Sequence, residues 1–246
     1  MLETKDFDFT GQRVLVTGAA SGLGQAMAKA FAGHGAELLL ADVDEAGVRA
    51  VAETLGATWQ VYDQAALTSV LALAEAAGAI DVLCNNAGIA RLGPLLEQTP
   101  DDIQALIATN FAGPVQLAVA VGRGMVERGR GVIVSTSSQL AFWGSAERGV
   151  YSATKAGISQ FTRAAAAAWA PHGVRVVALA PGRTLTAINQ YLRDDPEQYA
   201  ASLKMIPAGR LGNVEEMAKL TVFLASDAAS YVVGETLIAD GGFVLL

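Results

Sequence analysis

Short runs of apolar residues alternate along the chain with longer segments in which apolar residues recur every three or four positions. The short runs are continuous rather than alternating, which is typical of strands buried on both faces of a parallel sheet. These predicted strands cover residues 13–17, 36–42, 58–62, 81–85, 131–136, 174–180 and 235–240. The longer segments predict helices over 22–34, 44–55, 64–77, roughly 100–128, roughly 150–170 and 214–226.

This order of elements predicts an α/β fold, a doubly wound parallel sheet with right-handed crossovers and helices on both faces. No shift in composition marks a linker, so residues 1–246 are interpreted as a single domain. The segment 181–212 fits neither a strand nor a long helix, and in a compact domain such a segment is typical of a lid or binding loop. We therefore expect a substrate lid at about 183–210.

Composition narrows the class of protein. Of the 246 residues, 52% are hydrophobic and 17% are charged, which is enough to form a sizeable core. The formal net charge of −7 and the lack of a basic run argue against nucleic acid as a partner. The first residues form no apolar leader, and no stretch reaches eighteen uninterrupted apolar residues, so neither a secretion signal nor a membrane span is expected.

Cysteine and histidine are scarce in this sequence. Cys84 is the single cysteine, and His34 and His172 are the only histidines. Cys84 cannot form an internal disulfide, which fits a reducing cytoplasm, and its apolar surroundings predict a core position. With so few ligands of these types we predict no zinc-type cluster and no catalytic metal.

A glycine-rich turn, within the segment VLVTGAASGLGQ, joins the first predicted strand to the first predicted helix. Glycines let the backbone approach a pyrophosphate, and the helix N-terminus offers free N–H groups and a partial positive charge. An ordinary tight turn is the alternative, but the strand before it and the helix after it are the context that a dinucleotide site requires. The predicted contacts come from Thr17, Gly18, Ser21, Gly22, Leu23 and Gly24.

The second predicted strand ends at Asp42. A carboxylate there accepts hydrogen bonds from both hydroxyls of an adenosine ribose and would repel a 2′-phosphate. The next residue is Val43, so no cation follows to hold that phosphate. These two residues favour NAD over NADP. The alternative is a solvated aspartate that begins the turn DVDE and caps the next helix.

Together these residues resemble the short-chain dehydrogenase/reductase family over nearly the whole chain. The turn fits T-G-x-x-x-G-x-G, and NNAG follows the fourth strand at 85–88. Ser138 lies thirteen positions before the Y-x-x-x-K motif YSATK, Pro181-Gly182 follows the sixth strand, and 209–243 resembles the family's C-terminal signature. The resemblance implies a seven-stranded Rossmann-type sheet, hydride transfer to or from a nicotinamide, and often a homotetramer.

The resemblance also implies further cofactor contacts. They fall on Asp63, Asn85, Ala87, Gly88, Pro181, Gly182, Thr184 and Thr186, together with Tyr151 and Lys155. Three positions depart from the family pattern. Thr184 stands where an aliphatic residue is usual, Val177 replaces an asparagine, and Gln64 follows Asp63. Thr186 is the residue expected to supply the phosphate-side hydroxyl.

The catalytic prediction rests on Asn110, Ser138, Tyr151 and Lys155. Alcohol oxidation needs a base, and a free tyrosine with a pKa of about 10 is mostly protonated at neutral pH. Lys155 lies one helical turn after Tyr151 on the same face, and its charge favours the phenolate. Ser138, rather than its neighbour Ser137, matches the family spacing and can bind the substrate oxygen. Asn110 resembles the family residue that anchors a water beside the lysine. The alternative is a half-buried aromatic beside a solvated lysine.

Predicted substrate contacts lie after Ser138, before Tyr151 and in the lid. They are Ser138, Gln139, Trp143, Arg148, Tyr151 and Asn189, with Tyr191 and Arg193 also available in the lid. Arg148 can bind a carboxylate through two parallel hydrogen bonds. The alternative is an ion pair with Glu147 or with a neighbouring subunit.

These observations predict an NAD-dependent dehydrogenase for a small polar secondary alcohol, namely a sugar acid, hydroxy acid or polyol. A 3-oxoacyl carrier-protein reductase is the alternative within the same chemistry, and Asp42 and the −7 charge argue against it. A non-catalytic dinucleotide sensor or scaffold is the second class, but such proteins commonly lose the tyrosine or lysine. The alanine-rich stretch 163–170 is interpreted as a well-packed helix or a subunit contact.

Overall fold

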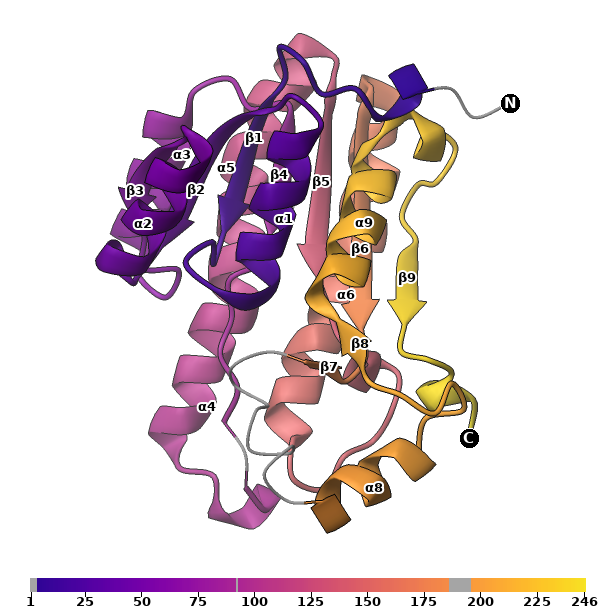
Figure 1. Ribbon diagram of the computed structural model, residues 1–246. Coiled ribbons are helices and arrows are strands. Elements are labelled where there is room, and N and C mark those ends of the chain that lie inside the picture. The colour runs from indigo at the N-terminus through magenta and orange to yellow at the C-terminus, as the bar shows by residue number, and fades with distance from the viewer. Residues whose placement is uncertain (1–3, 92, 186–195) are drawn as a thin grey trace.

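A computed structural model describes residues 4–91, 93–185 and 196–246. Its centre is a seven-stranded sheet in the order β3-β2-β1-β4-β5-β6-β9, with every neighbouring pair parallel (Figure 1). The strands are β1 Arg13–Thr17, β2 Glu37–Asp42, β3 Thr58–Val61, β4 Val82–Asn85, β5 Gly131–Thr136, β6 Val174–Pro181 and β9 Thr236–Ala239. All seven predicted strands are confirmed, with ends that differ by at most one residue.

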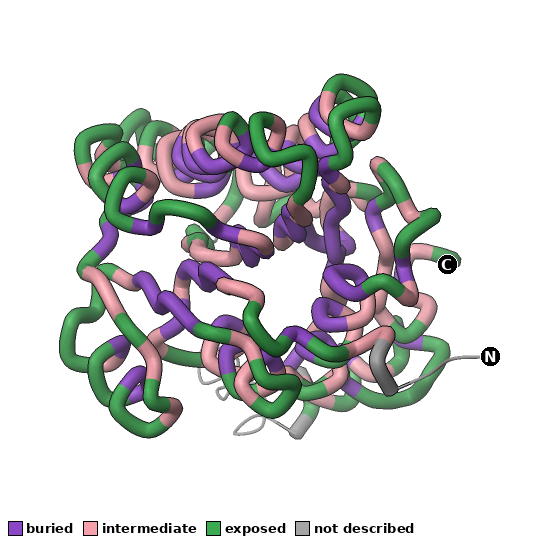
Figure 2. Tube along the Cα trace, turned by 90° about the horizontal axis from the view of Figure 1, so that it is seen from above, coloured by how far each residue is buried: buried purple, intermediate pink, exposed green. Residues whose placement is uncertain are grey.

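Helices cover both faces of this sheet. They are α1 Gly22–Gly33, α2 Glu45–Leu55, α3 Leu67–Ala77, α4 Pro100–Ile107, α5 Gly113–Arg128, α6 Gly149–Trp169 and α9 Val214–Ala225. The buried faces of α1, α2 and α9 form one apolar cluster with one face of the sheet, and those of α3, α5 and α6 form a second cluster with the other. Figure 2 shows the buried positions gathered between these layers. The doubly wound α/β prediction is confirmed.

Consecutive strand residues divide between the two clusters because side chains alternate along a strand. On β1, Val14 and Val16 belong to the first cluster and Leu15 to the second. Both faces are therefore apolar, which is why the strands appear in the sequence as continuous apolar runs. Cys84 on β4 is fully buried in the first cluster, as predicted.

The chain order reverses at β1, which lies between β2 and β4. At such a switch point the loops that follow the strands diverge to opposite faces and leave a crevice at the carboxyl ends. The glycine turn after β1, Asp42 at the end of β2 and the loop after β4 all meet there.

The helix predicted over roughly 100–128 is not one regular helix. The structure has α4, a π-helical turn Ala108–Ala112, and then α5. Pro114 lacks an N–H group, so one hydrogen bond of the regular α-helical ladder is missing where the π turn meets the first turn of α5. The whole run, Pro100–Arg128, is long and apolar enough to cross a membrane by length and composition alone, and 44% of its apolar window is buried in the fold.

The segment 181–212 was expected to contain neither strand nor long helix, and this expectation is partly wrong. Thr184–Leu185 (β7) pairs with Gly212–Asn213 (β8), and Pro196–Lys204 forms a nine-residue helix, α8. Figure 1 shows α8 beyond the carboxyl ends of β6 and β9. Residues 186–195 of the predicted lid lie outside the described residues.

Candidate active site

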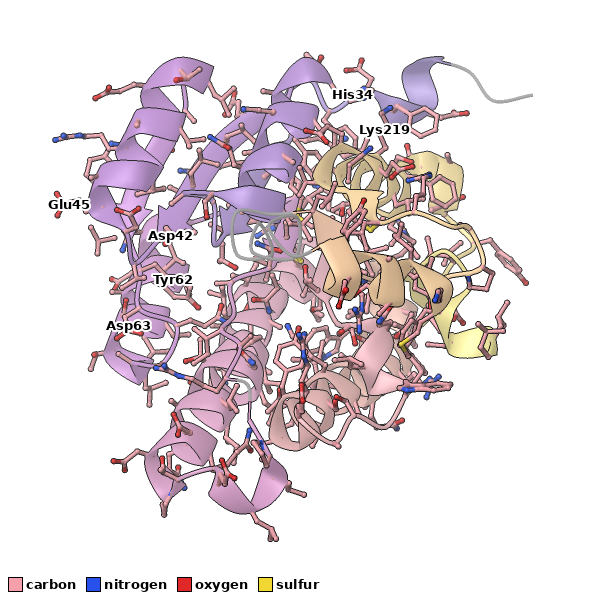
Figure 3. The ribbon with its side chains drawn as sticks, turned by 60° about the horizontal axis from the view of Figure 1, so that its bottom comes forward. His34, Asp42, Glu45, Tyr62, Asp63 and Lys219 are labelled. Carbon is pink, nitrogen blue, oxygen red and sulfur yellow. The ribbon has the colours of Figure 1, made fainter. Side chains whose placement is uncertain are left out.

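A cavity of about 420 Å³ opens at the carboxyl ends of β1, β2 and β4. Ten of the predicted cofactor residues line it: Gly18, Ser21, Gly22, Leu23, Gly24, Asp42, Val43, Asp63, Ala87 and Gly88. Five further lining residues were not predicted: Tyr62, Gln64, Asn86, Ile89 and Thr109. Figure 3 shows Asp42, Tyr62 and Asp63 following one another along the same side of the molecule.

The glycine turn has the geometry that brings backbone close to a ligand. Gly18 and Gly22 have φ values of +67° and +53°, which L side chains rarely adopt. A Cβ on Gly24 would lie 2.0 Å from the Gly18 carbonyl oxygen, so only glycine fits there. Helix α1 begins at Gly22, and within the described chain the Ser21 side chain makes no capping hydrogen bond. The first residues of α1, Gly22 to Gly24, line the cavity, and the N–H groups of a first helical turn have no partner within the helix, as in anion-binding helix N-termini.

Asp42 lies beside this turn and is half-buried. Its Oδ2 accepts a hydrogen bond from the Ala20 N–H at 3.0 Å, and its Oδ1 accepts one from the Asp44 N–H at 3.0 Å. The capping residue of α2 is Asp44, which accepts from the Gly47 N–H, so the alternative role of Asp42 as that cap is excluded. Val43 follows with 68% of its surface exposed.

The asparagine at the cavity is Asn86 rather than the predicted Asn85. Asn85 is buried and its Nδ2 donates to the Pro114 carbonyl of α5 at 2.7 Å, so it does not line the cavity. Asn86 Nδ2 donates to the Thr17 carbonyl, and its Oδ1 accepts from Thr136 Oγ1. Consecutive side chains of an extended segment point to opposite sides, and this alternation could have distinguished the two residues.

Thr17 does not line the cavity, but its side chain holds a neighbouring loop in place. Its side chain is fully buried, and its Oγ1 accepts hydrogen bonds from the N–H groups of Asn86 and Ala87, at 3.0 and 3.1 Å. The threonine therefore holds the loop after β4 against the glycine turn.

Tyr151 and Lys155 lie on the first turns of α6. The Lys155 Nζ is 5.8 Å from the centroid of the Tyr151 ring and donates to the Thr136 carbonyl at 2.8 Å. Burial lowers the pKa of Lys155 to about 8, so its ammonium form still predominates at neutral pH. Burial raises the pKa of the Tyr151 phenol, while a hydrogen bond with Ser138 and the positive charge of Arg148 act to lower it.

Ser138 follows β5 and begins the 3-10 turn Gln139–Ala141, where its Oγ accepts a hydrogen bond from the Leu140 N–H at 3.2 Å. Ser137 points the other way. Its Oγ donates to the Lys155 carbonyl and lies 2.8 Å from the Ser159 Oγ. The structure thus brings Ser138, and not Ser137, to Tyr151.

Asn110 is fully buried in the π turn. Its Oδ1 accepts from the Ile89 N–H at 2.9 Å and its Nδ2 donates to the Ile89 carbonyl at 2.8 Å. A Cβ on Gly88 would lie 3.1 Å from Asn110 Oδ1 and 3.6 Å from Lys155 Nζ. The predicted asparagine and lysine therefore flank the same glycine, which lines the cavity.

The Pro181-Gly182 turn ends β6, and Gly182 lies close to the predicted substrate side. A Cβ on Gly182 would lie 2.5 Å from the Asp240 Cα and 2.8 Å from Gln139 Oε1, so a side chain there would displace both. Thr184 is buried and its Oγ1 donates to the Gly182 carbonyl at 3.1 Å. Gln139 is buried, and its Oε1 finds no hydrogen-bond partner in the described parts of the chain.

Two further predicted substrate residues, Trp143 and Arg148, lie within the described chain. The Trp143 ring packs edge-on against Phe243, with centroids 5.5 Å apart. Arg148 is half-buried at the N-terminus of α6, and among residues 4–91, 93–185 and 196–246 no ion pair joins it to Glu147. Thr186 and Asn189, like Tyr191 and Arg193, lie outside the described residues. The described residues also contain no group of three or more metal-binding side chains.

The fold and this cluster define a Rossmann-type oxidoreductase in which a serine, a tyrosine and a lysine lie next to the glycine-lined cleft. A family model described as enoyl-(acyl carrier protein) reductase matches residues 18–244. Galactitol 2-dehydrogenase (L-tagatose-forming) of Cereibacter sphaeroides is 40% identical over 97% of each chain. The 3-oxoacyl-(acyl-carrier-protein) reductase FabG of Escherichia coli is 37% identical over 97% of this chain and all of its own.

Solved structures agree with this assignment. A gluconate 5-dehydrogenase from Burkholderia cenocepacia, in complex with NADP and tartrate, superimposes with a TM-score of 0.94, at 35% identity over 99% of each chain. The protein therefore belongs to the short-chain dehydrogenase/reductase family, as its motifs indicated.

Proposed function

We propose that this protein transfers a hydride between NAD(H) and a small polar secondary alcohol or its ketone. The observation that carries the proposal is the cluster of Ser138, Tyr151 and Lys155, which adjoins the glycine-lined cavity at Gly88. A non-catalytic sensor would not need a buried lysine with a lowered pKa beside that phenol.

The residues present fit a bound dinucleotide. The missing Cβ atoms of Gly18 and Gly24 leave backbone surface for a pyrophosphate, and Ser21 and the N-terminus of α1 supply hydrogen-bond donors. Asp42 would bind the adenosine ribose, and Lys155 the nicotinamide ribose. When bound, the nicotinamide supplies the hydride acceptor or donor.

The preference for NAD rests on Asp42 and Val43. A 2′-phosphate placed at the Asp42 carboxylate meets like charge, and exposed Val43 offers it no compensating cation. The B. cenocepacia gluconate 5-dehydrogenase structure contains NADP, so the proposal concerns the side chains of this chain and not the family as a whole.

In the oxidation direction, Tyr151 would take the proton from the substrate hydroxyl. The charge of Arg148 acts to lower the pKa of this phenol. The ammonium of Lys155, one helical turn away, would favour the phenolate by the same attraction, while Ser138 donates a hydrogen bond to the substrate oxygen. In reduction the same phenol returns the proton. Lys155 donates to the Thr136 carbonyl, and its Nζ lies on the side of Gly88 that Asn110 also faces, where a water-borne proton path would begin.

For the substrate we propose a sugar acid, hydroxy acid or polyol. Arg148 has a guanidinium beside Tyr151 and no partner at Glu147 in the described chain, so a substrate carboxylate could pair with it. The similarity to FabG favours a second candidate, a 3-oxoacyl carrier-protein reductase. The net charge of −7 disfavours it, because an acidic carrier would be repelled.

The test is a screen of NAD reduction across sugar acids, hydroxy acids, polyols and simple alcohols, with a 3-oxoacyl thioester in the reverse direction. We expect turnover with polar alcohols and a loss of at least about 100-fold for Tyr151→Phe. Arg148→Ala should raise KM for acids far more than for neutral polyols. Turnover by Tyr151→Phe at the unmodified rate would contradict the acid–base role, and preference for the thioester would favour the second candidate.

A further inference from the structure

Gln64 is a buried polar residue at the cavity that the reaction scheme above does not use. It follows Asp63 just beyond β3, is only 4% exposed, and is one of the positions at which the sequence departs from the family pattern. A buried side-chain amide is costly unless its hydrogen bonds are made, so its partners should show what it does.

Both N–H groups of the Gln64 amide serve backbone carbonyls of the active site. The Nε2 donates to the Ala87 carbonyl in the loop after β4 at 2.7 Å and to the Thr109 carbonyl in the π turn at 2.5 Å. The Oε1 faces the Tyr62 hydroxyl at a longer 3.4 Å. One side chain thus bridges two segments that are far apart in the sequence.

The Thr109 carbonyl needs such a donor. In a regular helix it would accept from the Gly113 N–H, but that group donates to the Ala108 carbonyl in the π turn. The next residue, Pro114, has no N–H to offer. The Gln64 amide therefore occupies a gap in the main-chain ladder that the π turn and the proline leave open.

Each of the two bridged carbonyls is next to a predicted site residue. Thr109 precedes Asn110, and Ala87 precedes Gly88. Asn110 in turn binds both the N–H and the carbonyl of Ile89. Two side-chain amides, from Gln64 and Asn110, therefore tie residues 87–89 to the π turn on either side of Gly88.

The backbone of Gln64 touches the same helix. A Cβ on Gly113 would lie only 2.0 Å from the Gln64 carbonyl oxygen, so the contact requires glycine. Gly88 faces both Asn110 and Lys155, as described above. A shift of the 87–89 segment would therefore change the separation of Asn110 from Lys155.

We propose that Gln64 is a positioning residue that acts through Asn110: its amide completes the π turn and holds Asn110 and Gly88 in register with Lys155. Because Asp63 lines the adenosine end of the cleft, the same residue links that end to the acid–base pair. This inference rests on the proposed function for its catalytic consequence, but the tie itself can be measured without turnover.

The test compares Gln64→Met, which keeps the length but removes both donors, with the unmodified enzyme and with Asn110→Ala. We expect Gln64→Met to lower kcat by about tenfold with the alcohol KM little changed, since coupled neighbours interact by on the order of 1 kcal/mol. When Gln64→Met is combined with Asn110→Ala, kcat should fall no further than in Asn110→Ala alone. Independent, additive losses, or an unchanged kcat, would overturn the proposal.

Hydrogen exchange separates this proposal from the proposed function. In Gln64→Met the amide of Ile89, which donates to Asn110, should exchange faster, whereas Val222→Ala, a core truncation in α9, should lower Tm without this local change. If the amide hydrogens of residues 87–89 and 108–113 exchanged in Gln64→Met as in the unmodified protein, the proposed link between the two segments would be wrong. If the unmodified protein oxidised no alcohol, the proposed function would fail, and the exchange result would still decide whether Gln64 holds Asn110.

Discussion

At the scale of single residues, we propose that the carboxylate of Asp42 sets the preference for NAD over NADP. It accepts a hydrogen bond from the glycine turn, so the 2′-phosphate of NADP at this position would be repelled by its negative charge. Asp42→Ala should narrow the ratio of kcat/KM for NAD over NADP by about tenfold, since juxtaposed like charges cost a kcal/mol or more.

Asp44→Ala is the matched control for that variant. It removes the cap of α2 two residues away and should lower stability without changing the cofactor ratio. The measurement is initial rates with both dinucleotides at one ionic strength. An Asp42→Ala enzyme with the original ratio would show that the preference arises elsewhere.

Arg148 should also set the pH at which Tyr151 works. Its positive charge lowers the pKa of the phenol, in opposition to burial. Oxidation needs the phenolate, so its rate rises with pH through that pKa. Arg148→Met should therefore move the rising limb of kcat/KM to higher pH, and Arg148→Lys should move it less. A neutral polyol is the substrate of choice, because carboxylate binding then plays no part. If the rising limb of the kcat/KM profile lay at the same pH in Arg148→Met as in the unmodified enzyme, the prediction would be wrong.

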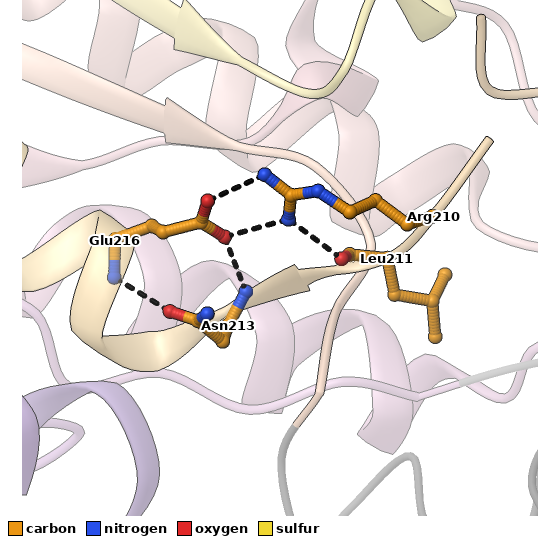
Figure 4. A network of polar contacts seen from close by, with 4 residues as sticks. All are labelled: Arg210, Leu211, Asn213 and Glu216. Atoms are coloured by element: carbon orange, nitrogen blue, oxygen red, sulfur yellow. Dashed lines mark hydrogen bonds and ion pairs between the residues drawn. The ribbon is translucent and has the colours of Figure 1, made fainter. Parts of the chain in front are cut away.

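At the scale of elements, the N-terminus of α9 is closed by a network of side chains (Figure 4). Asn213 and Glu216 form a capping box, each accepting from the other's N–H, and the Glu216 carboxylate also binds the Arg210 guanidinium at 2.6 and 2.9 Å. The network fixes the point where the chain leaves β8 and enters α9. Replacing the cap by Asn213→Ala typically costs about 1 kcal/mol.

The same network predicts a dependence of stability on acid. Hydrogen bonding from Arg210, then from the Asn213 backbone, lowers the pKa of Glu216 from 4.5 to about 2. The unfolded chain therefore takes up this proton first as the pH falls. The ionised Glu216 carboxylate therefore contributes fully to the free energy of unfolding above about pH 4.5, and this contribution is lost as the pH falls toward 2. Glu216→Gln should flatten the loss of unfolding free energy across this window in urea titrations. Glu215→Gln, outside the network, should leave the slope unchanged.

At the scale of the whole molecule, the outer face of α6 carries exposed alanines, including Ala164, Ala167 and Ala168. Small side chains let a second helix approach closely, and the partly exposed Phe111 ring packs beside Gly157 on the same helix. These features support the homotetramer that we propose. The predicted cytoplasmic location likewise remains a proposal.

Light scattering of the purified protein should give a mass about four times that of the 25.4 kDa chain. Ala164→Glu should lower that mass, because a buried unpaired charge is costly. Ala50→Glu, which places the same charge on exposed α2, should not. A monomeric mass for the unmodified protein would contradict the tetramer.

The sequence by itself determined the sheet, its seven strands and most of the cavity lining. Local patterns carry this information, since burial on both faces demands continuous apolar runs and a close backbone approach demands glycine at 18 and 24. The Ser138, Tyr151 and Lys155 positions followed from motif spacing, and the structure brings the three together.

Other features of the site became known from the tertiary structure. It placed Asn86 rather than Asn85 at the cavity, and it showed that Gln64 completes the turn around Asn110. The pattern of apolar and polar residues also predicted neither the π turn nor the helix α8. The positions of Gln64 and Asn86 depend on hydrogen bonds between segments distant in the chain, such as Gln64 to Thr109, and these leave no periodic signal in either segment.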